Sequence, residues 1–245
     1  MEISPDTSID KIASEMEASI PYFYEKLKID FTCDVNLSLN EACEFVGIPL
    51  KESIKTLQAI EKRSLSNPAA ARHWDQKSMA EIIDHILTDH HRYNREKIGE
   101  LTALLEKLPH VYGFDHPQLM FLKNLFGEMG DELKVHMSKE EEVIFPYLIK
   151  RERAEVEHTT IPNPFTDHPL FRQPIRILEW EHQMTGQEWK QVHLLTNGYT
   201  LPSNTGSNYR ALYEGLKSLE DDLHQHVHLE NNVLFKRALE KGWLE

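Results

Sequence analysis

The chain of 245 residues lacks the residues on which several classes of protein depend. Its two cysteines, Cys33 and Cys43, are too few for a disulfide framework or for a structural zinc site built from thiolates. Glycine is scarce, with ten residues, and no segment alternates apolar and polar residues as a strand does. Leu, Glu, Lys, Ile and Ala are common instead, and these residues favour helices. We therefore predict an all-α protein.

Positive charge and long apolar runs are also in short supply. Lys and Arg number 27 against 40 Asp and Glu, which gives a formal net charge of −13. Nucleic-acid binding needs clustered basic residues, so we expect no nucleic-acid partner. No apolar run approaches the roughly 18 residues of a membrane span, so we expect no membrane partner. The N-terminal sequence MEISPDTSIDKIASEMEAS lacks the pattern of a signal peptide, which predicts a cytoplasmic protein.

The first part of the chain, residues 1–66, is predicted to form a small helical N-terminal domain. Ser38 with Glu41 forms a capping box for one helix, Gly47 ends that helix, and Pro49 opens the next. So short a region can bury little apolar surface of its own. We expect it to pack against another surface, and a homodimer through this domain is one way to do so.

Residues 67–245 are predicted to form a second domain with four long helical segments, at about 78–107, 117–150, 173–196 and 208–240. Sequences rich in Pro, Gly and Asn separate them, such as PHVYGFDHP and NGYTLPSNTGSN. Helices of this length with short connections predict an antiparallel four-helix bundle. The connection between the second and third segments is the longest, roughly twenty residues, and could hold an extra turn or short helix.

Two of these segments carry the same pattern. HMSKEEEVIFPYL and HVHLENNVLFKRAL each contain a His with a Glu four residues later, giving the pairs His136–Glu140 and His226–Glu230. Both pairs interrupt an otherwise apolar helical stripe that should face the core. The two stripes read Leu122, Leu125, Met129, Leu133, His136, Glu140, Val143, Tyr147 and Leu212, Leu216, Leu219, Leu223, His226, Glu230, Val233. Buried imidazoles and carboxylates cost several kcal/mol unless they are paired or bound to a metal.

The other two segments each add one inward histidine, His91 and His182. Their stripes read Leu87, His91, Asn94, Ile98, Leu101, Leu105 and Ile175, Leu178, His182, Thr185, Trp189, Val192. Four imidazoles and two carboxylates facing one axis suit Fe, Mn or Zn, and the set fits a pair of iron ions. Each glutamate could bridge both ions.

The remaining histidines have ordinary explanations, since a single histidine on an inner helix face is usually a paired core residue. His90 turns about 100° from His91 and is the alternative ligand if the helix is rotated. His85 and His193 could support the ligands. His224 and His228 flank His226 on other faces and are expected to be solvated.

These patterns, together with IIDHILTDHHRYNREKI and EWEHQMTG, resemble the hemerythrin-like domain of the di-iron iron–sulfur cluster repair family over roughly Ser78–Leu239. The N-terminal region resembles that family's small helical domain. The resemblance implies a non-haem di-iron centre with oxo and carboxylate bridges. Its ligand positions fall on the six residues already selected, namely His91, His136, Glu140, His182, His226 and Glu230.

The resemblance also points to residues beside the metal. Glu132 and Glu181 match acidic residues near the family's metal site, where they could relay protons or guide iron. Solvated helix charges are an equally good explanation for both. The family's Cys-Cys-Gly-Gly motif reads DFTCDVN here, so Thr32 replaces the first cysteine and Cys33 alone remains. This change puts thiol chemistry in doubt, and Cys43 is expected to be a small buried apolar residue.

The resemblance implies a function in the stress response: repair of iron–sulfur clusters damaged by nitric oxide or peroxide, by donation of iron to damaged iron–sulfur proteins. Two alternatives remain open. The bundle could bind or sense dioxygen or nitric oxide, or its two irons could reduce nitric oxide. Whether the protein is an enzyme is left undecided by these patterns.

Overall fold

The computed structural model describes residues 3–29, 37–65, 74–165 and 173–243. Within these ranges the regular structure is helical, apart from one isolated bridge between Ser8 and Ser38, so the all-α prediction is confirmed. The chain divides into two compact units. The bundle unit is Asp84–Leu223, and the terminal unit combines Met1–Ile83 with His224–Glu245. The predicted domain boundary after residue 66 stays a prediction.

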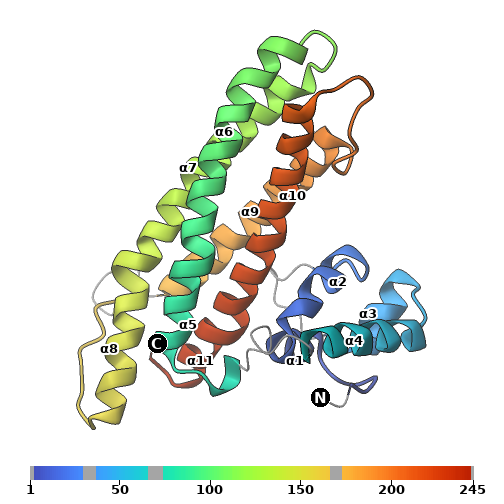
Figure 1. Cartoon of the computed structure of the whole chain (residues 1–245). Helices are drawn as coiled ribbons and strands as arrows, with labels where there is room; N and C mark the ends of the chain where they lie inside the picture. Colours follow the sequence, from blue (N-terminus) through green and yellow to red (C-terminus); the bar gives the residue numbers. More distant parts are fainter. Residues whose placement is uncertain (1–2, 30–36, 66–73, 166–172, 244–245) are drawn as a thin grey trace. The chain divides into compact units, whose positions relative to one another are not determined.

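The bundle unit contains the predicted antiparallel helices (Figure 1). They are α6 (Arg92–Tyr112), α7 (Gln118–Lys139), α9 (Pro174–Thr196) and α10 (Ser207–His228), of which the part up to Leu223 belongs to this unit. Successive helices run in alternating directions, as short connections require. The connection from α6 to α7 holds Gly113, and the one from α9 to α10 begins at Asn197, whose φ of 49° ends α9 in the left-handed region.

The apolar stripes of these helices form one continuous core. Its buried members are Ile98, Leu101, Leu105, Leu108, Leu119, Leu122, Phe126, Met129, Leu133, Met137, Trp189, Val192, Tyr209, Leu212, Tyr213, Leu216, Leu219 and Leu223. Gly215 lets α10 approach α6 closely, since a Cβ atom there would lie 2.7 Å from Cδ2 of Leu101. The stripes predicted at helical spacing thus pack as a bundle core.

In the described part of the chain, three helices contain a wider, π-helical turn. These turns are Ile86–His91 between α5 (Met79–His85) and α6, Glu140–Ile144 between α7 and α8 (Phe145–Val156), and Leu229–Phe235 between α10 and α11 (Lys236–Glu240). The chain therefore continues as helix through each of them. Because α8 runs on to Val156, the following connection is shorter than predicted. Residues 166–172 within it lie outside the described ranges, so an extra turn there stays a prediction.

The terminal unit begins with four helices, α1 (Ile9–Glu15), α2 (Ile20–Glu25), α3 (Leu39–Val46) and α4 (Leu50–Leu65). The predicted capping box of Ser38 and Glu41 is present, and Gly47 ends α3 with a φ of 72°. Contrary to expectation, this short region has a substantial apolar cluster. Its members are Ile9, Ile12, Ala13, Met16, Ile20, Phe23, Leu27, Ile29, Leu39, Ala42, Cys43 and Leu57.

Of the two cysteines, Cys43 lies within the described residues. Cys43 is buried in that cluster and its thiol donates to Oγ of Ser53 at 3.1 Å, as expected of a small core residue. Cys33 lies outside the described residues.

The C-terminal helix packs on the N-terminal part of the same unit. Lys236 contacts Asp10 of α1 at 2.9 Å, and Arg237 donates to the carbonyl oxygen of Trp74 at 2.8 Å. The Trp74 indole N–H in turn donates to Glu17 at 3.3 Å. These contacts join the two chain segments of the terminal unit.

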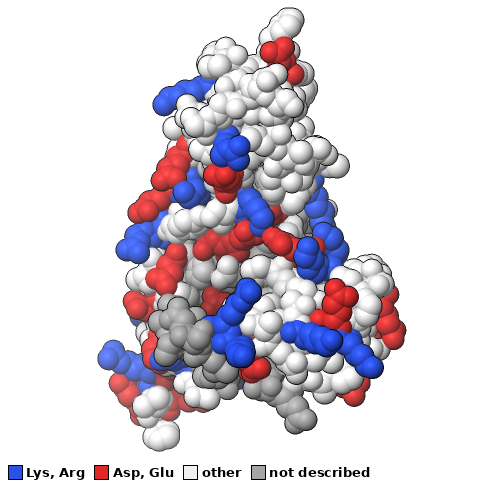
Figure 2. Space-filling view, turned by 45° about the vertical axis from the view of Figure 1, so that its right-hand side comes forward, with Lys and Arg blue, Asp and Glu red and all other residues white. Residues whose placement is uncertain are grey.

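Charged side chains of both signs are interspersed on the face shown in Figure 2. Among the described residues, charged side chains pair along helices, such as Lys97 with Glu100 at 2.6 Å and Lys217 with Asp221 at 2.7 Å. Such exposed pairs contribute little stability individually. None of the helices in the described part of the chain combines the length and the apolar character needed to cross a bilayer.

Candidate metal centre

The π-helical turns decide which side chains face inward. A π turn holds one more residue than an α turn, so it rotates the following helix face by about 100°. The prediction that Leu87 and Val143 face the core is wrong for this reason. Ile86 and Ile144 are buried instead, and Val143 is 48% exposed. π turns are rare and often accompany functional sites. Here each one contains or adjoins a predicted ligand.

Three predicted ligands from two helices meet in the bundle unit. Nε2 of His136 lies 3.3 Å from Oε1 of Glu140 and 2.9 Å from Nε2 of His182. All three side chains are buried, and one ligand atom from each lies within 4.8 Å of the others. The His-x-x-x-Glu pair on α7 and its π turn therefore faces His182 of α9.

A fourth predicted ligand, His91, lies near the other carboxylate oxygen of Glu140. Nε2 of His91 lies 3.5 Å from Oε2 of Glu140, whose side chain is 0% exposed. The two oxygens of Glu140 thus face different imidazoles. A carboxylate placed in this way has the geometry of a bridging ligand.

The second His-x-x-x-Glu pair lies in the terminal unit. Nε2 of His226 is 2.8 Å from Oε1 of Glu230, and both side chains are buried. The pair stands on the helix that continues from α10 through its π turn. It has the same internal arrangement as His136 and Glu140, with the carboxylate facing Nε2.

Two further carboxylates contact the outer nitrogens of the predicted ligands His91 and His136. Nδ1–H of His91 donates to Glu141 at 2.7 Å, and Nδ1–H of His136 donates to Glu181 at 2.8 Å. Each contact leaves the Nε2 lone pair directed toward Glu140. This arrangement orients a histidine ligand and raises its basicity.

Basic side chains keep both outer carboxylates ionised. Burial opposes ionisation of Glu181, but hydrogen bonds from His136 and Lys139 outweigh it and lower its pKa to about 2. Burial likewise opposes ionisation of Glu141, and hydrogen bonds from Arg95 and His91 keep its pKa below the ordinary value. Glu181 was among the residues predicted beside the metal. Glu141 was missed, because its sequence position next to Glu140 gives no sign of which neighbour faces His91.

Replacing Glu141 with Ala is expected to weaken metal binding by about 10–100-fold, because His91 loses the group that orients it. Equilibrium dialysis against iron measures the change. Glu142→Ala is the matched control, since Glu142 is exposed on the same π turn. Equal iron affinity in the two variants would contradict a role for Glu141.

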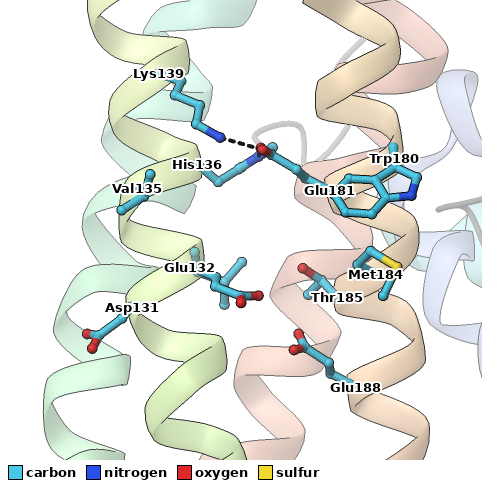
Figure 3. A pocket seen from close by; sticks show the side chains of 11 residues that line it. Asp131, Glu132, Val135, His136, Lys139, Trp180, Glu181, Met184, Thr185 and Glu188 are labelled. Atoms are coloured by element: carbon cyan, nitrogen blue, oxygen red, sulfur yellow. Dashed lines mark hydrogen bonds and ion pairs between the residues drawn. The ribbon is translucent and has the colours of Figure 1, made fainter.

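A cavity of about 500 Å³ lies beside His136, between α7 and α9 (Figure 3). His136 and Glu181 form part of its wall, and the ion pair of Glu181 with Lys139 crosses it. Glu132 is exposed and points into the space between the two helices, as does Glu188. Glu132 thus lines the same cavity as His136, and its role in relaying protons or guiding iron stays a prediction. Burial, with the charges of Glu132 and Glu128, raises the pKa of Glu188 from 4.5 to about 7.

The raised pKa of Glu188 predicts a pH dependence of stability. A carboxyl that is harder to ionise in the folded state stabilises the fold below its unfolded pKa of 4.5, and this contribution is lost as the pH rises through about 7. The melting temperature should therefore fall less between pH 5 and pH 8 in Glu188→Gln than in the unmodified protein. Identical pH profiles would refute this prediction.

Three other histidines depart from the sequence-based interpretation. His90 is buried and its Nδ1 lies 3.1 Å from Oδ1 of Asp222. His224 and His228 were expected to be solvated, and this is wrong because both pack against the terminal unit's first helices. The ring centroids of His224 and Tyr24 are 3.6 Å apart.

Burial lowers the pKa of His228 to about 4, so its ring is neutral at pH 7. Its nitrogens lie 3.4 Å from Oγ of Ser14 and 3.1 Å from Asn232. Such polar neighbours explain how a histidine can be buried without a metal. His193, predicted as a supporting residue, contacts the buried Glu220 at 2.8 Å, which also accepts from Tyr199.

The donor set fits iron. Imidazole nitrogen and carboxylate oxygen together suit Fe, Mn and Zn better than metals that prefer thiolates. In the bundle unit, the Nε2 atoms of His91, His136 and His182 and the carboxylate oxygens of Glu140 are buried and lie close together. Uncompensated burial of these groups would be costly, so a bound cation gives the arrangement a physical reason.

Comparison with known proteins adds two findings. The sequence model of the hemerythrin HHE cation binding domain matches residues 82–238. Over nearly the whole chain, the sequence is 32% identical to a probable iron–sulfur cluster repair protein of Haemophilus influenzae, with 92% of this chain and 95% of that protein covered. Repair proteins named ScdA, of Staphylococcus haemolyticus, and YtfE, of Pectobacterium atrosepticum, are 31% and 30% identical, over 93% and 94% of this chain and 97% of each relative.

Proposed function

Because this chain belongs to the hemerythrin HHE cation-binding family, and to its iron–sulfur cluster repair proteins, we propose that it repairs damaged iron–sulfur clusters with iron held in its helical bundle. The observation that carries the proposal is the buried carboxylate of Glu140, with one oxygen facing His136 and the other facing His91. This is the arrangement expected of a group that joins two cations.

The proposed site holds two non-haem iron ions. Its ligands are the residues selected at the outset, His91, His136, Glu140, His182, His226 and Glu230. His226 and Glu230 are included because they repeat the arrangement of His136 and Glu140 further along the helix that continues from α10. Glu140 and Glu230 are the proposed bridging carboxylates. Bound iron would supply an exchangeable, redox-active cation to the damaged cluster.

The residues around the site support delivery of iron rather than permanent storage. Glu140 and Glu230 would hold the iron through carboxylate oxygens, which can bind a cation with one oxygen or with two and would so allow a loosely held ion. Glu181 and Glu141 orient His136 and His91 toward it. The cavity beside His136 connects this side of the site with solvent, and Lys139 balances the charge of Glu181 in its wall.

The proposal is tested by mixing the iron-loaded, reduced protein with an enzyme whose iron–sulfur cluster has been nitrosylated or oxidised. We expect enzyme activity to return faster than with the same amount of free ferrous iron, in the presence of a chelator that captures free iron. Glu140→Leu protein serves as the control and should restore little activity. Recovery with free iron alone, and none with the loaded protein, would overturn donation.

One observation bears on reversible dioxygen or nitric oxide binding as an alternative function. Gly186, four residues after His182, is buried and offers no side chain as a further ligand from α9. A metal centre with fewer protein ligands is expected to hold its iron more loosely. This favours iron donation over stable, reversible binding of dioxygen. A long-lived visible complex after mixing with air would support the carrier, whereas rapid oxidation would support the repair function. Nitrous oxide formed in a single turnover would instead indicate nitric oxide reduction.

A further inference from the structure

A second pair of histidines is brought together by the first π turn. His85 and His90 are five residues apart, which places them about 140° apart around a regular α-helix. The i to i+5 pattern of the π turn Ile86–His91 aligns residues five apart. The same turn directs His91 toward Glu140. It therefore places two adjacent histidines, His90 and His91, in different surroundings.

The two rings have the spacing of a metal-binding pair. Their centroids are 5.0 Å apart with an interplanar angle of 72°, and a ring nitrogen of each lies within 4.8 Å of the other. The His90 side chain is buried and the His85 side chain is 11% exposed.

Each ring is also oriented by a carboxylate through Nδ1. Nδ1–H of His85 donates to Oδ2 of Asp89 at 2.7 Å, and Nδ1–H of His90 donates to Oδ1 of Asp222 at 3.1 Å. Because Nδ1 of each ring contacts a carboxylate, Nε2 is the nitrogen that would bind a metal. The pattern is the one found at His91 with Glu141 and at His136 with Glu181.

The two carboxylates are themselves suited to a cationic site. Oδ1 of Asp89 accepts from the Thr88 hydroxyl at 3.1 Å, which fixes its orientation. Oδ2 of Asp222 is buried and accepts no hydrogen bond from the described residues. A carboxylate with one such oxygen is stabilised by nearby positive charge.

We propose that His85 and His90 form an auxiliary metal site that binds one divalent transition-metal ion, such as zinc or cobalt. The two imidazoles are its protein nitrogen ligands, Asp89 and Asp222 orient them, and water completes the coordination. Imidazole ligands suit this class of metal, whereas calcium and magnesium prefer oxygen. The site is separate from the six residues proposed for iron, and its occupancy does not depend on the repair function.

The test uses Co²⁺ as the probe on the full-length, iron-loaded protein. Equilibrium dialysis, with cobalt and iron both measured, should show one cobalt per chain beyond the iron, with visible absorption bands of nitrogen-coordinated cobalt. His90→Gln and His85→Gln should each lose this cobalt while iron content is unchanged. Asp222→Asn should weaken cobalt binding by about 10–100-fold, because it removes the orienting carboxylate.

His193→Gln is the matched control, since His193 also contacts a carboxylate but lies on α9. It should bind cobalt as the unmodified protein does. Circular dichroism confirms that each variant is folded, and cobalt-edge anomalous diffraction of the unmodified protein gives a second readout that needs no variant. Cobalt binding that is equal in all variants, or an anomalous peak away from residues 85 and 90, would overturn the proposal. Loss of iron with retained cobalt in His90→Gln would also overturn it, because His90 would then serve the iron site.

Discussion

Replacing both Glu140 and Glu230 with leucine is expected to remove most of the iron from the protein while the helices remain intact. Loss of groups that merely orient metal ligands already costs about 10–100-fold in affinity, so loss of both carboxylate ligands should cost more than that. Iron per chain, measured by chemical analysis after purification from iron-supplied cells, reports the result. Far-ultraviolet circular dichroism reports the helices.

The metal-free form of this double variant should be no less stable than the metal-free unmodified protein. Both carboxylates are fully buried, and leucine at the same positions extends the apolar stripes of the two helices. Replacing buried charged groups with apolar ones of similar volume is often neutral or stabilising. Glu142→Leu, an exposed change next to the site, is the control and should keep its iron. Normal iron content in the double variant would refute the ligand assignment.

Truncation of Phe126 to alanine is expected to have the largest effect on stability. Phe126 lies on α7, is 1% exposed and belongs to the continuous core of the bundle. Removing a buried phenyl ring typically lowers the free energy of unfolding by about 3–5 kcal/mol, through lost burial and the cavity left behind. Urea unfolding of metal-free protein, followed by circular dichroism, measures this change without the contribution of bound iron.

Phe121 provides a control on the same helix. It is 66% exposed, so Phe121→Ala removes few packing contacts and should change the free energy of unfolding by less than about 0.5 kcal/mol. The two variants make the same chemical change at positions five residues apart. Equal destabilisation by both would mean that the helix faces have been assigned wrongly.

Most of the helical architecture could be predicted from the sequence. Apolar residues at spacings of three and four dictate which side of each helix is buried, as Leu212, Leu216 and Leu219 show on α10. Helix capping is equally predictable from the sequence. The side chains of Ser38 and Glu41 accept hydrogen bonds from backbone N–H groups at the start of α3, and this depends only on residues close in sequence. These features depend on neighbours in the sequence, so the sequence is sufficient to predict them.

The helix rotation around the predicted metal ligands could not be predicted in this way. A π turn has no strong local signal, and its extra residue changes which side chains within the turn face inward. For this reason Val143 was expected to face the core and Ile144 does so. His90 was an alternative to His91 because the rotation of its helix was open; both are buried, and they have different partners.

The sequence by itself determined that this is an all-helical protein with imidazoles and carboxylates on apolar helix faces, because periodicity and burial cost are properties of each helix. Only the tertiary structure decided which groups surround each of these side chains. Glu141 orients His91 while Glu142 is exposed, and His228 is buried rather than solvated. Such choices follow from contacts between segments far apart in the chain, which no local pattern contains.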